Sequence, residues 1–366
     1  MNRKDLLTQL AALRGENETL RGRLAALQSD NASIYALLDH LREGIAIVDR
    51  HSAVLLVNRS ALAMFGIQGD LAGKSVLELF RDVELTALLR GALASRQAET
   101  QHIRGGRTYQ ALFSPAGDGA MVLFLDITEK VGAEAMRRQF SANVSHELKT
   151  PLTGILGYAE LLSSGMAQPE DAREFAGKIQ SEAQQLIRLV EDILLLSQLD
   201  EAGTLPAPEP VELGGVAAAV TEALAAKSRK HGVRLRCEAP ETWVQGNRTL
   251  LYELLYNLVD NAIKYNRSGG RACVAISREA GRAVVEVRDT GIGIAPEHQG
   301  RVLERFYRVD RSRSKKTGGT GLGLSIVKHI AAVHGGTVEL QSQVGRGSVI
   351  KVTLGVPDSF SPQSGR

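Results

Sequence analysis

Apolar residues recur every seven positions through the first 41 residues, a pattern typical of a coiled coil. Leu or Ile fills one heptad position, and Leu alternates with Asn three places earlier. Paired asparagines in a parallel dimer select one register at a cost in stability. The pattern predicts a parallel homodimeric coiled coil over residues 1–41; the alternative is one long helix packed on its own chain. The two series are Leu6, Leu13, Leu20, Leu27, Ile34 and Leu41, and Leu10, Asn17, Leu24, Asn31 and Leu38.

Between residues 35 and 128 the period changes and short strands are expected. Asn58–Phe65 predicts a short helix that Gly66 ends, and Asp126 is placed to cap a new helix. The predicted strands are Gly44–Asp49, Val54–Val57, Arg107–Ser114 and Met121–Leu125.

This strand–strand–helix opening, with the closing Asp126-Ile127-Thr128, resembles a PAS domain over residues 35–128. The resemblance implies a sensor module, which either binds a small ligand or relays strain without one. The segment holds no cysteine, which excludes a cysteinyl-flavin adduct. His51 and His102 are candidate haem ligands, with surface histidines as the alternative, and the PAS ligand is unknown.

Helical spacing resumes after Asp126 in two long segments joined by the loop Gly165–Pro169. Two amphipathic helices with a short loop form a hairpin, and two hairpins of a homodimer make a four-helix bundle. We expect this dimerisation and phosphotransfer hairpin over residues 129–200. Pro151 lies inside the first helix and should kink it just after His146.

The string His146-Glu147-Leu148-Lys149-Thr150-Pro151-Leu152 resembles the H-box of sensor histidine kinases. Neutral imidazole is a nucleophile at physiological pH, and one ring nitrogen can attack phosphorus. The resemblance implies that His146 accepts the phosphoryl group and that Glu147 is the base. Thr150 lies four residues on, on the same helix face, where the family's pattern implies that it aims a water in dephosphorylation.

A proline-rich linker is expected over residues 201–211, followed by alternating strands and helices over 212–358 and a tail over 359–366. In the helix that follows Leu251, the polar residues Glu253, Asn257 and Asn261 recur every four positions and share one face. Amide and carboxylate oxygens suit Mg²⁺ beside phosphates. Asn261 and Glu253 are therefore the candidate metal ligands.

Asp289 ends a predicted strand, on the same face as the apolar Val285 and Val287. A carboxylate on a core face needs a donor, and the amino group of adenine is one; the alternative is that Asp289 only caps its own loop.

Two further segments favour phosphate binding. The glycine-rich run 318–324 precedes a helix, where backbone N–H groups can approach phosphate oxygens. The basic run 301–316 predicts a mobile lid over the triphosphate, with nucleic-acid binding as the competing interpretation. Its basic residues are Arg301, Arg305, Arg308, Arg311, Arg313, Lys315 and Lys316.

Together these segments, with Phe306-Tyr307-Arg308, resemble the N, G1, F and G2 boxes of the GHKL-type ATP-binding fold of histidine kinases. The resemblance implies an α/β sandwich that binds ATP with Mg²⁺. The residues that it implies for the nucleotide are Asn257, Asn261, Lys264, Tyr265, Asp289, Gly291, Gly293, Arg308, Gly319, Thr320, Gly321, Leu322 and Gly323.

The amino-acid composition excludes several kinds of protein. Two cysteines among 366 residues exclude a disulfide scaffold and a cysteine zinc site, and a net charge of +3 does not indicate nucleic-acid binding. No run approaches the length of a membrane helix, so we expect a cytoplasmic protein without membrane insertion. The fold class is multidomain α and α/β: coiled coil, PAS-like domain, dimeric helical hairpin and GHKL-type sandwich.

The sequence therefore predicts an enzyme, a protein histidine kinase that autophosphorylates from ATP. It would transfer the phosphoryl group to an aspartate of a response regulator receiver domain, and it would also dephosphorylate that regulator. The alternatives are a GHKL ATPase clamp and a degenerate scaffold that only binds a regulator. The stimulus, the regulator and its genes, the kinase to phosphatase balance, and cis or trans phosphorylation stay open.

Overall fold

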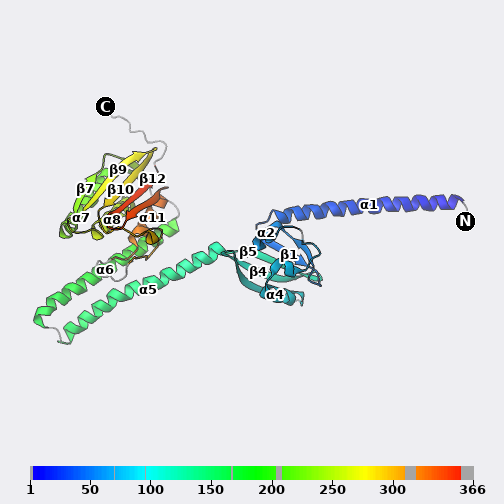
Figure 1. Cartoon of the computed structure of the whole chain (residues 1–366), viewed down its shortest axis with the longest axis horizontal. Helices are drawn as coiled ribbons and strands as arrows, with labels where there is room; N and C mark the ends of the chain where they lie inside the picture. Colours follow the sequence, from blue (N-terminus) through cyan, green and yellow to red (C-terminus); the bar gives the residue numbers. More distant parts are fainter. Residues whose placement is uncertain are drawn as a thin grey trace, which may run out of the picture. The chain divides into compact units, whose positions relative to one another are not determined.

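The computed structural model describes residues 3–69, 71–94, 96–165, 168–202, 208–309 and 319–355. They form two compact units, Met1–Arg138 and Gln139–Arg366, and each is described by itself (Figure 1). The basic-run residues Arg311, Arg313, Lys315 and Lys316, the glycine Gly318, residues 203–207 of the predicted linker and the whole predicted tail lie outside the described residues.

Helix α1 (Arg3–Asp39) opens the first unit. From Leu13 onward its heptad leucines are largely exposed in the single chain: Leu20 is 57% and Leu27 62% exposed. Such a row of exposed leucines on one helix needs a partner surface. The homodimeric coiled coil stays a prediction.

A five-stranded antiparallel sheet follows, in the order β2-β1-β5-β4-β3. Helices α2, α3 and α4 pack with it around a core that includes four phenylalanines: Phe65, Phe80, Phe113 and Phe124. The bounds are β1 Gly44–Val48, β2 Val54–Val57, α2 Arg59–Phe65, α3 Val76–Phe80, α4 Val83–Leu93, β3 Ala98–Arg104, β4 Arg107–Ala116 and β5 Gly119–Asp126.

The buried Asn58 joins three elements of this unit. Its side-chain oxygen accepts hydrogen bonds from the N–H of Ile45 and of Ala61, at 2.8 and 3.0 Å. Its amide donates to the carbonyls of Leu38 and Glu43, at 2.9 and 2.8 Å. The N-cap of α2 thereby also anchors β1 and the end of α1, as a buried amide must satisfy all its hydrogen bonds.

The two histidines considered for haem lie apart from one another. His51 is exposed in the β1–β2 turn, where its Nε2 accepts from Arg50 Nε at 3.1 Å. His102 on β3 stacks on Phe65 at 6.3 Å between ring centroids, and its Nδ1 lies 3.7 Å from Asp82. The phenylalanine cluster fills the described core beside His102.

The second unit begins within α5 (Thr128–Ser163), which forms a hairpin with α6 (Pro169–Ala202). Helix α5 runs through Pro151 without interruption. The Asp126 carboxylate accepts from the Thr128 N–H at 3.0 Å, as predicted for a residue that caps this helix, and the regular helix begins at Thr128.

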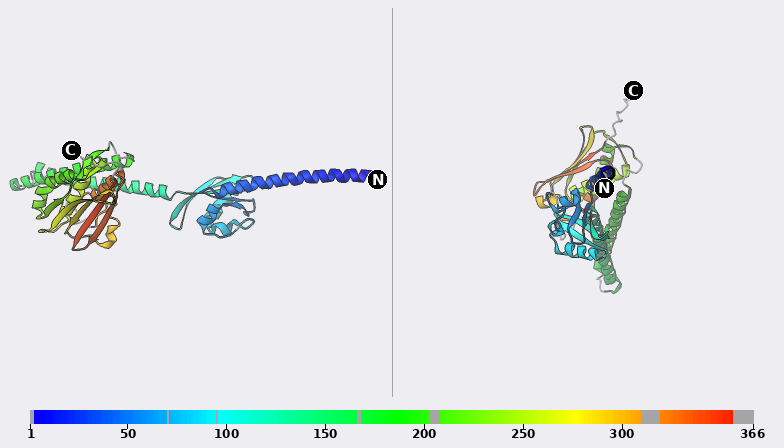
Figure 2. Two further views of the ribbon diagram at one scale, coloured as in Figure 1. Left: turned by 90° about the horizontal axis from the view of Figure 1, so that it is seen from above. Right: turned by 90° about the vertical axis from the view of Figure 1, so that its right-hand side faces the viewer.

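The rest of this unit is an α/β sandwich. Its five-stranded sheet has the order β11-β12-β10-β9-β7, in which only the β7–β9 pair is parallel. Helices α7, α8 and α11 form the other layer (Figure 2). The bounds are α7 Leu213–Lys230, β7 Arg234–Glu238, α8 Arg248–Lys264, β9 Arg271–Glu279, β10 Arg282–Asp289, α9 Pro296–Gln299, α11 Gly323–Val333, β11 Thr337–Gln343 and β12 Gly347–Leu354. A two-stranded sheet, β6 (Glu209–Glu212) with β8 (Trp243–Gly246), completes it.

Candidate active site

His146 lies on α5 with 76% of its side chain exposed. It lines a shallow groove of about 380 Å³ together with Lys149, Thr150, Thr153 and Gly154. The Thr150 hydroxyl donates to the His146 carbonyl at 3.2 Å, a common bond for a threonine inside a helix. The imidazole is thus open to an incoming phosphoryl group or partner protein.

Glu147 links the hairpin to the sandwich. Its Oε1 lies 4.0 Å from His146 Nδ1, and its Oε2 accepts a hydrogen bond of 3.4 Å from Arg308 Nη1. The Arg308 side chain is only 11% exposed, and its buried Nε has no partner among the described residues. A buried guanidinium N–H without an acceptor costs free energy, so this position is prepared for a further anion.

Helix α8 presents the predicted polar face. The Asn257 amide donates to the Glu253 carbonyl at 2.9 Å, and an added Cβ at Gly323 would lie 2.6 Å from Asn257 Oδ1. Asn261 is half-buried on the same helix. Glu253 and Asn261 are eight residues apart, about 12 Å along the axis, so they do not form a metal site by themselves. Burial raises the pKa of Glu253, and the charge of Glu191 adds to this.

Lys264 and Tyr265 end α8 beside the glycine-rich loop. An added Cβ at Gly319 would lie 3.0 Å from Lys264 Nζ and 3.2 Å from the Tyr265 hydroxyl. Burial lowers the pKa of Lys264 to about 8 and raises that of Tyr265. A buried ammonium group next to a phosphate-binding loop is stabilised by an anionic ligand.

Asp289 ends β10, half-buried, and its Oδ1 accepts from the Gly291 N–H at 2.7 Å. Burial raises the pKa of this carboxyl group. The bond to Gly291 means that Asp289 caps its own loop, as the alternative interpretation of this residue predicts. An added Cβ at Gly291 would lie 2.3 Å from the Tyr265 carbonyl, and one at Gly293 would lie 2.0 Å from the Gln343 carbonyl. Only glycine fits at these two positions.

The described end of the glycine-rich loop, 319–323, leads into α11. Gly321 has a φ of 74° and its carbonyl accepts from the Phe306 N–H at 2.9 Å. The Thr320 hydroxyl accepts from the Leu322 N–H at 3.2 Å, and Leu322 is fully buried. The predicted nucleotide residues on α8, after β10 and before α11 therefore belong to one unit and partly touch.

Three segments of the chain match known families, in the order in which the sequence predicts the domains. Residues 38–132 match the PAS fold, 136–202 match the His Kinase A phospho-acceptor domain, and 246–358 match the histidine kinase-, DNA gyrase B- and HSP90-like ATPases. Over 345 residues the chain is 34% identical to the sensor-like histidine kinase SenX3 of Mycolicibacterium smegmatis, which covers 91% of this chain and 88% of that relative. The chain belongs to the sensor histidine kinase family.

Two further proteins are similar to this kinase. SenX3 of Mycobacterium tuberculosis H37Rv is 35% identical over 319 residues, which cover 85% of this chain and 77% of the relative. The structure of the Acinetobacter baumannii histidine kinase AdeS is 23% identical and has a TM-score of 0.49, with 58% of this chain and 98% of that chain covered.

These matches confirm the predicted fold class and the predicted enzyme class, a protein histidine kinase of two-component signalling with an ATPase-type nucleotide domain. The phospho-acceptor domain distinguishes the kinase from ATPase clamps that share the nucleotide fold. Among the described helices none is long and apolar enough to cross a membrane. The described residues also hold no cluster of three or more His, Cys, Asp or Glu side chains that suits a metal ion.

Sequence reasoning missed two acidic residues of α6 that contact the nucleotide domain of the kinase. Asp192 Oδ2 accepts from the Thr320 hydroxyl at 3.0 Å. Burial raises the pKa of Asp192 to about 6; the hydrogen bond from Thr320 lowers it, and the negative charges of Glu253 and Glu191 raise it further. Asp200 Oδ1 accepts from Arg305 Nη2 at 2.6 Å.

The Asp200–Arg305 pair extends to a histidine and to an aromatic contact. Arg305 Nη2 lies 2.8 Å from His329 Nε2, while His329 Nδ1 lies 2.7 Å from the Ser325 carbonyl, so Nδ1 carries the proton and Nε2 accepts. The Arg305 guanidinium also lies 5.5 Å from the centre of the Phe140 ring on α5. The only sequence signal was a pair of acids on a face of α6 that is otherwise apolar, at Leu189, Leu196 and Leu199.

Proposed function

We propose that this histidine kinase transfers the γ-phosphoryl group of ATP to His146 and from there to an aspartate of a response regulator receiver domain. The observation that carries the proposal is the Glu147–Arg308 contact, which places the acid beside His146 next to a basic residue of the nucleotide domain. The exposure of His146 leaves room for both the donor and the acceptor of the phosphoryl group.

In the proposed reaction one imidazole nitrogen attacks the γ-phosphorus, the bond from phosphorus to the bridging oxygen breaks, and ADP leaves. The other ring nitrogen gives its proton to Glu147. Arg308 has a buried Nε without a partner in the described part of the chain, and this N–H is available to a phosphate oxygen. Lys264 supplies a second positive charge beside the glycine-rich loop.

The nucleotide would lie along α8 and the two glycine turns. Asp289 accepts a hydrogen bond from the amino group of adenine, and the backbone of 319–323 faces the phosphates. Mg²⁺, when bound, neutralises charge on the β- and γ-phosphates. The amide oxygen of Asn261 fits such an ion together with phosphate oxygens and waters, whereas Glu253 on the same helix lies towards the acidic residues of α6.

The experiment uses labelled ATP and the full chain. A phosphoramidate is labile in acid and stable in base, unlike a phosphoserine ester, so the label should be removed by acid. His146→Gln should take up no label, and the matched variant His51→Gln, at an exposed histidine outside the hairpin, should label normally. Acid-stable label, or label that persists in His146→Gln, would assign a different acceptor.

The kinase is proposed to act as a homodimer through the coiled coil, the PAS domain and the hairpin. The hairpin helices expose leucines and isoleucines that a four-helix bundle would bury, including Leu152 and Leu156 at 58% each and Ile187 at 58%. One chain has a mass of 39.4 kDa. Sedimentation of the full chain should give twice that mass. A monomer at micromolar concentration would reject this part of the proposal. No nucleic acid is needed for any step.

A further inference from the structure

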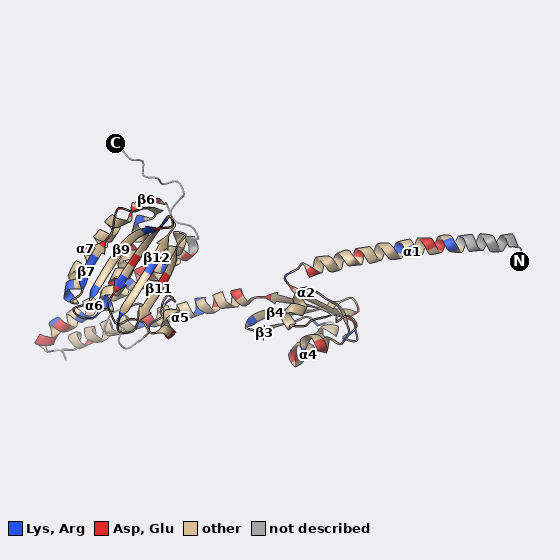
Figure 3. Ribbon diagram, turned by 45° about the horizontal axis from the view of Figure 1, so that its top comes forward, with Lys and Arg blue, Asp and Glu red and all other residues tan. Residues whose placement is uncertain are grey.

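A pocket of about 330 Å³ lies at the end of the nucleotide-domain sheet where β7 and β9 begin. Three arginines line it, Arg234, Arg267 and Arg271, together with Ser268 and Thr290. All three arginines are exposed, and none belongs to the residues proposed to bind ATP. Figure 3 shows further basic residues in blue around α7 and β7.

The strand register forces two of these positive charges together. Arg234 and Arg271 are directly paired in the parallel β7–β9 ladder. Neighbouring strands are about 4.8 Å apart, and like charges directly opposite each other are unfavourable. Neither guanidinium has a hydrogen bond or an ion pair within the described ranges, and Arg236, two residues further on β7, is also exposed and unpaired there.

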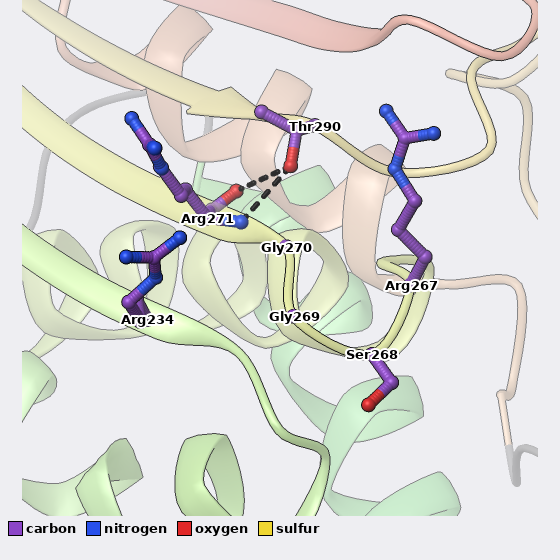
Figure 4. Close-up of a pocket in the computed structure, with 7 residues that line it drawn as sticks. All are labelled: Arg234, Arg267, Ser268, Gly269, Gly270, Arg271 and Thr290. Carbon is purple, nitrogen blue, oxygen red and sulfur yellow. Dashed lines mark hydrogen bonds between the residues drawn. The ribbon is translucent and has the colours of Figure 1, made fainter.

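Backbone hydrogen bonds hold the loop beside the two arginines. The Arg234 N–H donates to the Gly270 carbonyl at 2.9 Å, and the Gly269 N–H donates to the Gly232 carbonyl at 2.8 Å. In Figure 4 the Ser268 side chain points away from Arg234 and Arg271. Figure 4 shows Arg234 and Arg271 side by side on one side of this loop and Arg267 on the other.

The same loop is bonded to the turn that carries Asp289. The Arg271 N–H donates to the Thr290 hydroxyl at 2.9 Å, and the Thr290 N–H donates to the Arg271 carbonyl at 3.1 Å. The Asn266 amide donates to the same carbonyl at 2.9 Å. The pocket therefore shares backbone contacts with the residue that directly follows Asp289.

We propose that Arg234 and Arg271 bind a small multivalent oxyanion, a phosphate or a di- or tricarboxylate. Guanidinium groups bind such anions through paired N–H donors, and two adjacent guanidiniums favour an anion with at least two charges. Because the anion would hold Arg271 and its bonds to Thr290 in place, it would also stabilise the turn of Asp289 and strengthen nucleotide binding. This second statement rests on the proposed ATP site; the anion site itself does not.

The test is calorimetric titration of the full chain after saturation with a non-hydrolysable ATP analogue and Mg²⁺, at constant ionic strength. Pyrophosphate and tricarballylate are the two probes, and chloride is the monovalent control. We expect one anion per chain, and the probe that binds more tightly identifies the phosphate or the carboxylate source. Arg234→Ala and Arg271→Ala should each weaken binding by about tenfold or more, since each removes charge-assisted hydrogen bonds.

Arg282→Ala is the matched control, because Arg282 is an exposed arginine on the same sheet whose strand pairing places it at the opposite end from Arg271. It should bind the anion like the unmodified chain. Absence of binding by both probes, or equal loss in all three variants, would overturn the site. Failure of the ATP analogue to bind would reject the proposed nucleotide site instead, and the anion would then be titrated into the protein without the analogue.

The effect on the nucleotide is measured by repeating the analogue titration with and without the anion. The analogue should bind more tightly with the anion present, and by linkage the anion should bind more tightly with the analogue. Thr290→Val, which removes the hydroxyl that accepts from Arg271, should abolish this difference, and Thr290→Ser should keep it. Equal analogue affinity with and without a bound anion would overturn the coupling.

Discussion

Replacing Asp192 by Asn should strengthen the packing of the nucleotide domain on the hairpin near neutral pH. The Asp192 carboxyl accepts from Thr320, and burial raises its pKa from the ordinary 3.8 to about 6. One pKa unit corresponds to about 1.4 kcal/mol, so an ionised Asp192 weakens this packing by about 3 kcal/mol at pH 7. The oxygen of an asparagine keeps the bond to Thr320 and removes the charge.

The direction of the pH dependence follows from the raised pKa. Below about pH 3 the carboxyl is protonated whether the domains are packed or separated, and the charge has no effect. As the pH rises from about 4 to about 6 the separated form loses its proton first, so packing weakens, and the full effect is reached near pH 7. In the Asp192→Asn variant this pH dependence should disappear.

Hydrogen exchange of the backbone amides in 319–323 measures the packing, and the variant is compared with the unmodified chain at one pH at a time. At pH 7.5 exchange should be slower in Asp192→Asn by up to about 100-fold, and at pH 3 the two should be nearly equal. Asp171→Asn, at an exposed acid in the first turn of the same helix, is the matched control and should change nothing. Equal exchange at both pH values, or faster exchange in Asp192→Asn, would refute the reasoning.

Three further predictions concern the same unit. Asp200→Asn should weaken the packing of the nucleotide domain on the hairpin by about 1 kcal/mol, because its partner Arg305 is only partly shielded from solvent. Hydrogen exchange measures this change, and the control is Glu304→Gln, which alters an exposed ion pair on the same segment. Asp289→Ala should abolish binding of the ATP analogue in calorimetry, and unchanged affinity would contradict the adenine contact. Thr150→Ala should leave labelling of the kinase intact and slow the decay of a phosphorylated regulator in the presence of ADP; a parallel fall in both activities would indicate a structural role.

Local sequence was enough where a short segment determines its own conformation. Asn58 and Gly66 were placed correctly at the two ends of α2, since an N-cap side chain and a left-handed glycine act within a few residues. The sequence also singled out Gly291 and Gly293, and the structure shows that neither position has room for a side chain. The residue types themselves carry this information.

The edge strand β3 was missed because its side chains give no hydrophobic alternation. Its sequence AETQHIR alternates only between half-buried and exposed positions, and its one large aliphatic residue, Ile103, is 74% exposed. The helices α3 and α4 were missed as well, although Ser75 and Asp82 cap them in the ordinary way. Both helices carry apolar residues at helical spacing, among them Leu79, Phe80, Leu85 and Leu89, so the signal was present in the sequence and was overlooked.

The contacts between the hairpin and the nucleotide domain could not be derived from sequence. Arg308 lies 161 residues from Glu147, and Thr320 lies 128 residues from Asp192. Each side chain alone is an ordinary polar residue on a helix or loop, and only the packing of α11 and the Phe306 segment on the hairpin brings the partners together. The pKa of Asp192 depends on this packing for the same reason.

These contacts set packing and nucleotide binding against each other. In the packed unit Arg308 donates to Glu147 and Thr320 donates to Asp192. A triphosphate is a stronger acceptor than either carboxylate, and it repels both. In the ATP-bound state proposed above, displacement of Glu147 from Arg308 would free Glu147 to take the proton of His146. Where the packed form and the nucleotide-bound form exclude each other, a change in the acids of α6 that weakens the packing raises the apparent affinity for ATP, at most by the factor by which the packing weakens.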